Sequence, residues 1–370
     1  MKGSQTHQQT RSKQPVTGND RQPLRLGLVG CGRVVEWYHL PALKRSPDWQ
    51  LVAVCEPLAE RRDWVQQRYP GLPAFASLSE LLKGSTAEAL LIATPPATHY
   101  PLAVQALEAG LHVLVEKPMA LHVQDASALL HASQRAQRQL WVGFNRRFRR
   151  PYLDLRRRLA LVPSEAIRAI RCIFVFEAQR WTPAASRSAA DASGSGVLDD
   201  VASHQVDLLP WLLGQPVQEV TTTHLGKDVA GLESLRYELK LANGLVASCQ
   251  ASHGRRYVEQ LEVQLRNRTF VTYPGGLLAV RWRPVGWLQP YCQLRAVWHL
   301  CVHKLTRTPN DATDSFTKQL AAFAAAIRGE GQSFAGADAR SGLGSVQVLH
   351  ACRESLRTGG RWTPLPCTIT

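Results

Sequence analysis

The sequence offers little sulfur chemistry and no long hydrophobic run. Its eight cysteines are scattered singly, with no C-x-x-C pair, and most lie in apolar, strand-like runs. This arrangement is typical of buried free thiols and indicates neither a disulfide framework nor a zinc site, so no metal is expected. No stretch reaches the roughly 18 to 20 uninterrupted apolar residues of a membrane-spanning helix. The sequence therefore predicts a protein that does not associate with membranes.

The N-terminus also lacks an apolar core. Residues 1–22 are polar and rich in Gln, Thr and Ser, without the hydrophobic segment of a secretory signal. We interpret them as a disordered tail and expect a cytoplasmic location.

Acidic residues are fewer than basic ones. The 44 Lys and Arg residues exceed the 29 Asp and Glu residues, which gives a formal net charge of +15. Clusters such as NRRFRRPYLDLRRRL (145–159) could form a nucleic-acid surface, a solvated helix face or an attraction for an anionic small molecule. No nucleic-acid recognition motif accompanies the charge, so no nucleic-acid partner is expected.

Length and apolar content indicate two packed domains. The chain has 370 residues, of which 45% are hydrophobic. Within residues 23–146, short apolar runs alternate with helical patterns, which predicts parallel βαβ units in a doubly wound α/β domain. Ser79 is expected to cap one of the helices. The expected strands are 24–30, 51–55, 89–94, 112–116 and 140–144.

Residues 147–370 show a different pattern. The runs 166–179, 234–254 and 257–276 are typical of long strands, with Asn243-Gly244 as a hairpin turn. Two helical segments stand apart, 198–214 and 315–328, and 184–196 has the composition of a mobile loop. The pattern predicts an α+β domain with a mainly antiparallel, open sheet.

The motif GLVGCGRVV (27–35) follows the first expected strand and opens a helix. In a dinucleotide-binding turn, Gly30 would allow the tight bend and Gly32 would let the backbone approach a pyrophosphate. Val35 stands where this fingerprint prefers Gly or Ala, so a plain strand-to-helix turn is the alternative. The expected cofactor contacts are Gly30, Cys31, Gly32, Arg33 and Val34.

The acid after the second strand indicates which cofactor binds. Glu56 occupies the place of the carboxylate that holds the adenosine ribose hydroxyls. Because a carboxylate there repels a 2′-phosphate, NAD is expected in preference to NADP. Arg61 and Arg62 lie close by in the sequence and keep NADP open.

Prolines shape the next strand end. In TPPATH (94–99), two prolines hold an extended turn at the edge where ligands of open α/β sheets bind. Thr94, Pro95 and His99 are therefore expected cofactor contacts, and a stiff connector is the alternative.

A lysine ends the following strand in VLVEKPMA (113–120). Lys117 lies at the carboxyl end of this strand, and Pro118 biases it away from helical geometry. A partly desolvated lysine there can donate to a reacting oxygen, so Glu116 and Lys117 are expected to contact the cofactor. The alternative is a lysine that simply pairs with Glu116.

A helix with the pattern D-x-x-x-H forms the second constellation. Asp200, His204 and Asp207 share one face of the helix predicted in SGSGVLDDVASHQVDLLPWLLG (193–214). The acid and the imidazole could orient one another, with His204 exchanging a proton near neutral pH. A structural helix with a hydrogen-bonded histidine is the alternative. Metal binding is disfavoured because no Cys or further His has a matching spacing.

Taken in order, these motifs resemble the Gfo/Idh/MocA family of NAD(P)-dependent oxidoreductases, named for glucose-fructose oxidoreductase and inositol dehydrogenase. The E-K-P signature and the downstream D-x-x-x-H are the specific parts. The resemblance implies an N-terminal Rossmann domain and a catalytic group of Lys117, Asp200 and His204. It also implies a homodimer or homotetramer formed through the C-terminal sheet, and substrates that are sugars, sugar derivatives or cyclitols.

The sequence therefore predicts an NAD(P)-dependent dehydrogenase or reductase acting on a CH–OH group. In oxidation, His204 would accept the hydroxyl proton, Lys117 would stabilise the oxyanion and Asp200 would orient the site. The alternative is a non-catalytic dinucleotide- or sugar-sensing regulator on the same fold. Arginines in the loop 179–195 favour an anionic substrate, such as a sugar nucleotide or sugar acid. The expected substrate contacts are Asn145, Arg180, Trp181, Asp200 and His204.

Overall fold

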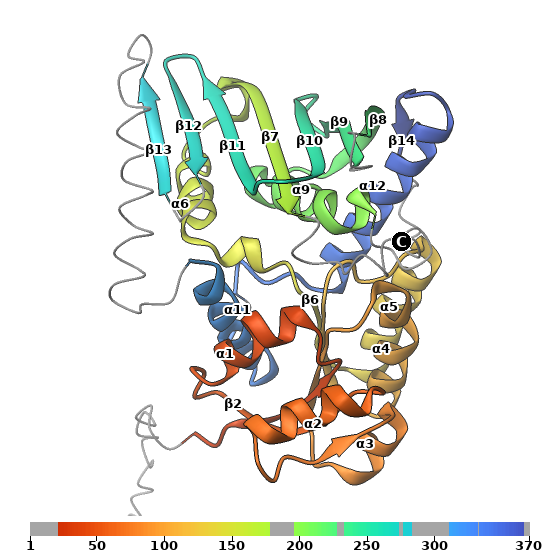
Figure 1. The fold of residues 1–370 in the computed structure, drawn as a ribbon. Coiled ribbons are helices and arrows are strands. Elements are labelled where there is room, and N and C mark those ends of the chain that lie inside the picture. Colours follow the sequence, from red (N-terminus) through yellow and green to blue (C-terminus); the bar gives the residue numbers. More distant parts are fainter. Residues whose placement is uncertain are drawn as a thin grey trace, which may run out of the picture.

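Two sheets with their helices lie one above the other (Figure 1). The computed structural model describes residues 21–177, 196–227, 233–273, 277–282, 311–331 and 333–365. The expected mobile loop lies outside these residues, except for Gly196, and the expected N-terminal tail lies outside them apart from its last two positions.

The first sheet has six parallel strands in the order β3-β2-β1-β4-β5-β6, which confirms the doubly wound α/β prediction. Its central strands β1 and β4 are mostly apolar, as expected where helices cover both faces of a sheet. The sequence order reverses between β1 and β4, and ligands of such sheets bind beyond the carboxyl ends of the strands there. The strands are β1 (Leu24–Val29), β2 (Trp49–Cys55), β3 (Ala74–Phe75), β4 (Ala89–Ile92), β5 (His112–Val115) and β6 (Leu140–Val142).

Helices connect these strands, as their sequence spacing predicts. They are the π-helical η1 (Val35–His39), α1 (Leu40–Leu43), α2 (Ala59–Arg68), α3 (Leu78–Gly84), α4 (His99–Glu108) and α5 (Val123–Ala136). The predicted cap at Ser79 is wrong. Helix α3 begins at Leu78, so the capping position is Ser77, whose hydroxyl accepts a hydrogen bond from the Glu80 amide at 3.3 Å.

The second sheet has eight strands in the order β13-β12-β11-β7-β10-β9-β8-β14. Every neighbouring pair is antiparallel except β7 and β10, so the mainly antiparallel prediction is confirmed. Gly244 has a φ of +79°, as the predicted turn between β9 and β10 requires. The strands are β7 (Ile167–Glu177), β8 (Val217–Lys227), β9 (Glu233–Leu241), β10 (Val246–Gly254), β11 (Val258–Leu265), β12 (Arg268–Tyr273), β13 (Leu277–Trp282) and β14 (Thr363–Pro364).

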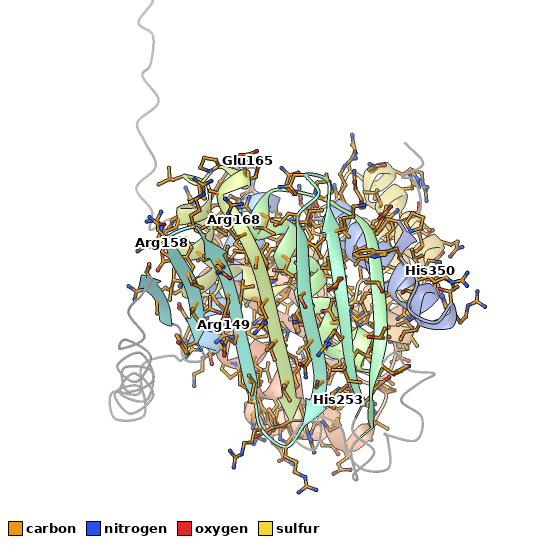
Figure 2. All side chains as sticks on the ribbon, turned by 90° about the horizontal axis from the view of Figure 1, so that it is seen from above. Arg149, Arg158, Glu165, Arg168, His253 and His350 are labelled. Atoms are coloured by element: carbon orange, nitrogen blue, oxygen red, sulfur yellow. The ribbon has the colours of Figure 1, made fainter. Side chains whose placement is uncertain are left out.

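Helices lie on one face of this sheet, between it and the first domain (Figure 1). They are α6 (Arg150–Leu159), α9 (Ser203–Leu213) and α12 (Ala339–Arg357), and the sequence did not reveal α12. Figure 2 looks onto the opposite face, where the strands lie in front of all the helices. None of the helices in the described ranges is long and apolar enough to cross a membrane.

The chain returns to the first domain near its end. Helix α11 (Asp311–Ile327) packs against the first sheet, where Phe323 contacts the rings of Trp49 and Trp141 with centroid distances of 5.6 Å. The Trp49 indole donates to the Leu320 carbonyl at 2.9 Å, and the Val142 amide donates to the Ala337 carbonyl at 2.8 Å. The first domain, which was expected to end at residue 146, therefore also includes the later helix α11.

Candidate active site

The glycine-rich turn after β1 has the backbone that its sequence predicts. Gly30 has a φ of +90°, and a Cβ there would lie 2.6 Å from the Ala93 carbonyl oxygen, so only glycine fits. A Cβ at Gly32 would meet no atom within 4 Å, which suits the expected approach of a phosphate. Val35 is fully buried and begins the π-helix η1 instead of ending the turn with a small residue.

Glu56 lies against this turn. Its Oε2 accepts the Cys31 amide hydrogen at 2.8 Å, and its Oε1 accepts the Leu58 amide hydrogen at 3.1 Å. Both nearby arginines bind backbone carbonyls: Arg61 Nε donates to Cys31 at 3.0 Å and Arg62 Nη1 donates to Glu56 at 2.6 Å. The carboxylate therefore stands beside the turn where the ribose is expected.

His99 ties two loops of the site together. It is fully buried, with Nδ1 2.7 Å from the Pro118 carbonyl oxygen and Nε2 2.9 Å from the Thr94 carbonyl oxygen. Burial lowers the pKa of His99 despite these two carbonyls. This geometry joins the turn after β4 to the loop after β5, and a direct contact of His99 with the cofactor stays a prediction.

Glu116 is held by a histidine that the sequence did not mark. Its Oε1 lies 2.7 Å from His39 Nε2 in η1, and its Oε2 accepts the Lys117 amide hydrogen at 3.2 Å. Burial alone would raise the pKa of Glu116, but His39 and Lys117 outweigh it and hold this pKa below its usual value. A Cβ at Gly143 would lie 2.9 Å from the carboxyl carbon, so the loop closes tightly around this acid.

Lys117 and Asp200 meet between the two domains. Lys117 Nζ donates to Asp200 Oδ1 at 3.0 Å and to the Asp200 backbone oxygen at 2.9 Å. Burial opposes ionisation of Asp200, but Lys117 and a hydrogen bond from His253 hold its pKa well below its usual range. The structure therefore brings together two of the three expected catalytic residues as an ion pair.

His204 does not form the predicted pair with Asp200. Asp200 lies in the π-helical turn η6 (Leu198–Ala202), whose wider winding changes which side chains stack on one face. Among the described residues, Asp200 Oδ2 instead lies 3.2 Å from His253 Nε2 on β10. His204 is buried one turn further on, and in the described part of the chain its Nδ1 has no hydrogen-bond partner.

His204 nevertheless lies among charged neighbours of the site. Burial first, and then the charges of Arg146, Lys117 and Arg149, hold its pKa well below its usual value. Its ring lies 5.8 Å from that of Phe176, and the Arg146 guanidinium lies 4.8 Å from the Phe176 ring. Burial and these positive charges therefore favour the neutral imidazole form of His204.

The arginine-rich segment 145–159 was expected to form, as one alternative, a solvated helix face, but several of its arginines are buried. Arg146, Arg147 and Arg149 are buried, whereas Arg157 in α6 is exposed. Asp207, the second acid of the predicted helix face, does not join Lys117 but pairs with Arg147 through two hydrogen bonds.

A buried carboxylate holds the other two arginines. Glu259 on β11 accepts hydrogen bonds from Arg149 at 2.6 Å, from Tyr152 at 2.6 Å and from Arg146 at 3.4 Å. The sequence does not predict these ion pairs, because the partner acids Asp207 and Glu259 lie far along the chain from the arginines.

The remaining expected contacts lie partly outside the described residues. Asn145 is buried and donates to Ser315 Oγ in α11 at 3.0 Å. Arg180 and Trp181 fall outside the described ranges, and their role stays a prediction. Within those ranges, no group of three or more His, Cys, Asp or Glu residues is placed to hold a metal ion.

Two family models match successive parts of the chain. Residues 24–144 match the model of the "Oxidoreductase family, NAD-binding Rossmann fold", and residues 160–271 match the "GFO/IDH/MocA C-terminal domain". The chain belongs to the Gfo/Idh/MocA oxidoreductase family. Its first domain is an NAD-binding Rossmann domain, and the protein is an NAD(P)-dependent dehydrogenase of this family.

The curated relatives MocA and inositol 2-dehydrogenase are about a quarter identical to this chain over the aligned residues. The rhizopine catabolism protein MocA of Rhizobium meliloti is 27% identical over 240 residues, which cover 63% of this chain and 72% of that protein. An inositol 2-dehydrogenase of Corynebacterium glutamicum is 26% identical over 268 residues, which cover 70% and 76% of the two proteins.

Solved structures of the Gfo/Idh/MocA type share the whole fold. The WlbA dehydrogenase from Bordetella pertussis, in complex with NADH and UDP-GlcNAcA, matches with a TM-score of 0.75 and 23% identity over 95% of this chain and 99% of that one. A scyllo-inositol dehydrogenase from Lactobacillus casei, with NAD(H) and scyllo-inositol, matches with a TM-score of 0.74 and 18% identity over 93% of this chain and 99% of that one. At these identities the likeness establishes the fold alone.

Proposed function

We propose that this protein transfers a hydride between NAD and a secondary alcohol or ketone of a sugar, a sugar derivative or a cyclitol. The Lys117–Asp200 ion pair carries the proposal, because it lies beyond β5 at the same edge of the sheet as the glycine-rich turn. Bound NAD supplies the carbon that accepts or gives the hydride. The residues present fit this cofactor, since Gly30, Gly32 and Glu56 stand where its diphosphate and ribose are expected.

The proposed roles follow from the charge states. Lys117, with its ammonium held by an ionised Asp200, donates a hydrogen bond to the substrate oxygen and stabilises its negative charge in the transition state. His204 is neutral because burial and neighbouring cations lower its pKa, so it can accept the hydroxyl proton. Positioned acid–base groups contribute about a hundredfold to ten-thousandfold in rate.

A substrate screen with a matched pair of lysine variants tests this proposal. Purified protein is incubated with NAD and, in turn, myo-inositol, scyllo-inositol and UDP-GlcNAcA, and NADH formation is followed by absorbance. Lys117→Met should lower kcat by about a hundredfold or more while NADH binding, measured by fluorescence titration, persists. Lys318→Met serves as the control, because Lys318 forms an exposed ion pair with Asp314 on α11. Undiminished turnover by Lys117→Met would overturn the assignment.

We further propose that the substrate carries a negative charge. Arg146, Arg149 and Lys117 all lower the pKa of His204, and these three cations exceed by one their two carboxylate partners, Glu259 and Asp200. A partly desolvated site with a surplus of positive charge favours an anionic group such as a sugar carboxylate or a nucleotide diphosphate. UDP-GlcNAcA and its neutral-sugar counterpart UDP-GlcNAc should be compared with the cyclitols. Turnover of the cyclitols alone would remove this part of the proposal.

The outer face of the second sheet supports a proposal on assembly. No described helix covers this face (Figure 2), and the burial pattern of β7 turns Ile173 and Val175 toward it. We propose that two or four copies associate through it, since an uncovered sheet face with apolar residues is typical of an interface. Light scattering should show a dimer or tetramer for the natural protein and a smaller species for Ile173→Glu. A monomeric natural protein would refute the proposal.

A further inference from the structure

A histidine of the second sheet lies against the Asp200 carboxylate. His253 belongs to β10, where it pairs in register with Phe176 of β7, and it lies near the end of its strand (Figure 2). Its Nε2 lies 3.2 Å from Asp200 Oδ2, and its side chain is 15% exposed. A residue of the second sheet thus reaches the ion pair between the two domains.

The two oxygens of Asp200 have different partners. Oδ1 faces Lys117 Nζ and Oδ2 faces His253 Nε2. A carboxylate bound on one oxygen only can rotate about its terminal bond, because that torsion is broad. A donor on each oxygen fixes the carboxylate plane, and with it the direction in which Asp200 holds Lys117.

The contact also defines the tautomer of His253. Ionised Asp200 offers only acceptors, so Nε2 must carry the hydrogen of a neutral His253 ring, with Nδ1 bare. The geometry is that of an acid that orients an imidazole, which the sequence predicts for His204. The structure gives this partnership to His253, and His204 stands apart from the carboxylate.

We propose that His253 is a positioning residue of the hydride-transfer site, which acts on Lys117 through Asp200. This inference rests on the proposed function, since it assigns His253 to the same catalytic group. In this assignment, His204 exchanges the substrate proton, and His253 fixes the orientation of the Asp200 carboxylate that holds Lys117. A site with two histidines in these separate roles differs from the three-residue group that the sequence predicts.

Three variants separate the hydrogen bond from the bulk of the ring. His253→Phe keeps a ring but removes the donor, His253→Ala removes both, and His253→Gln restores an amide donor at a similar reach. With the substrate that the screen identifies, we expect His253→Phe to lose about tenfold to hundredfold in kcat with little change in KM. His253→Gln should recover most of that loss, which a purely structural role would not produce.

His224 provides the matched control. It also lies on the second sheet beside a carboxylate, with its Nδ1 3.5 Å from Glu233 Oε1, but 55% of its side chain is exposed. His224→Phe and His224→Gln should both leave kcat unchanged. Thermal unfolding of every variant shows whether it folds, and His253→Ala replaces His253→Phe if the latter does not.

Nitrogen-15 NMR of the histidine side chains tests the contact without turnover. The resonances lost in His253→Gln identify His253, and above neutral pH they should show a protonated Nε2 and a bare Nδ1. Asp200→Asn should shift these resonances. A bare Nε2, or resonances that ignore Asp200→Asn, would refute the inference even if the enzyme is active.

The kinetic and spectroscopic outcomes separate the two proposals. An active natural protein with an inactive Lys117→Met variant upholds the proposed function, and unchanged kcat in His253→Phe then overturns the role of His253 alone. If no substrate is turned over, or Lys117→Met stays fully active, the proposed function fails and the inference fails with it.

Discussion

Replacing Arg147 by methionine should cost far more stability than the same change at Arg157. The Arg147 and Asp207 side chains are 7% and 2% exposed, and Nε and Nη2 of Arg147 donate to the two carboxylate oxygens at 2.9 Å and 2.5 Å. Arg147 Nη1 also donates to the Gly336 carbonyl at 2.9 Å. Removing the guanidinium leaves a buried carboxylate without its partner, which costs about 3–5 kcal/mol.

Arg157 offers the same chemistry at the surface. Its Nη1 lies 3.3 Å from Asp154 Oδ1, but the two side chains are 67% and 37% exposed. Water screens such a pair, which contributes about 0–1 kcal/mol. The difference between the two substitutions should therefore be about 3 kcal/mol, and most of it comes from burial.

Urea unfolding followed by circular dichroism measures both changes. The double variant Arg147→Met with Asp207→Leu adds a further check, because replacing both charges by apolar groups should recover part of the loss. Equal losses in Arg147→Met and Arg157→Met would refute the reasoning. So would a double variant that is less stable than Arg147→Met by the full cost of a second buried defect.

Three further predictions concern the first domain. Gly30→Ala should lower the melting temperature and NADH affinity, because its methyl group meets the Ala93 carbonyl, whereas Gly32→Ala should weaken NADH binding at unchanged melting temperature. Glu56→Gln should raise NADPH affinity relative to NADH by about tenfold, measured by fluorescence titration, and an unchanged ratio would contradict the assigned ribose contact. Burial, aided by Arg138, lowers the pKa of His112 from 6.5 to about 4, so the unfolded chain binds the proton more readily and stability falls as the pH drops through this range. His112→Gln should reduce that loss in urea unfolding at pH 6.5 and pH 4, and an identical loss would count against it.

The sequence predicts the first domain well because its signals are local. Each strand is a short apolar run, each connection has the length of a helix, and Gly30 has the positive φ that its motif implies. The E-K-P and D-x-x-x-H motifs, together with the family resemblance, place Lys117 and Asp200 in one predicted catalytic group. Their contact confirms that the motifs meet in space, while their catalytic roles stay predictions.

The residues that sequence reasoning missed depend on distant pairing. His253 follows an ordinary strand pattern, and only the register of β10 against β7 carries it to Asp200. Arg147 and Arg149 look like surface residues because their carboxylate partners lie far along the chain. The sequence does not predict helix α12, because glycine and serine in its first turns lower its intrinsic helix propensity.

The position of helix α11 determines how the two domains of this enzyme can be separated. The chain passes from the first domain to the second, returns to the first in α11 and enters the second again in α12 and β14. Three covalent connections therefore join the two domains, and a single break leaves two of them intact. A protein ending at residue 146 would expose Trp49 and Trp141, which now pack on Phe323. Separating the cofactor half from the substrate half therefore needs three cuts, and a domain exchange with a relative must carry α11 together with the first sheet.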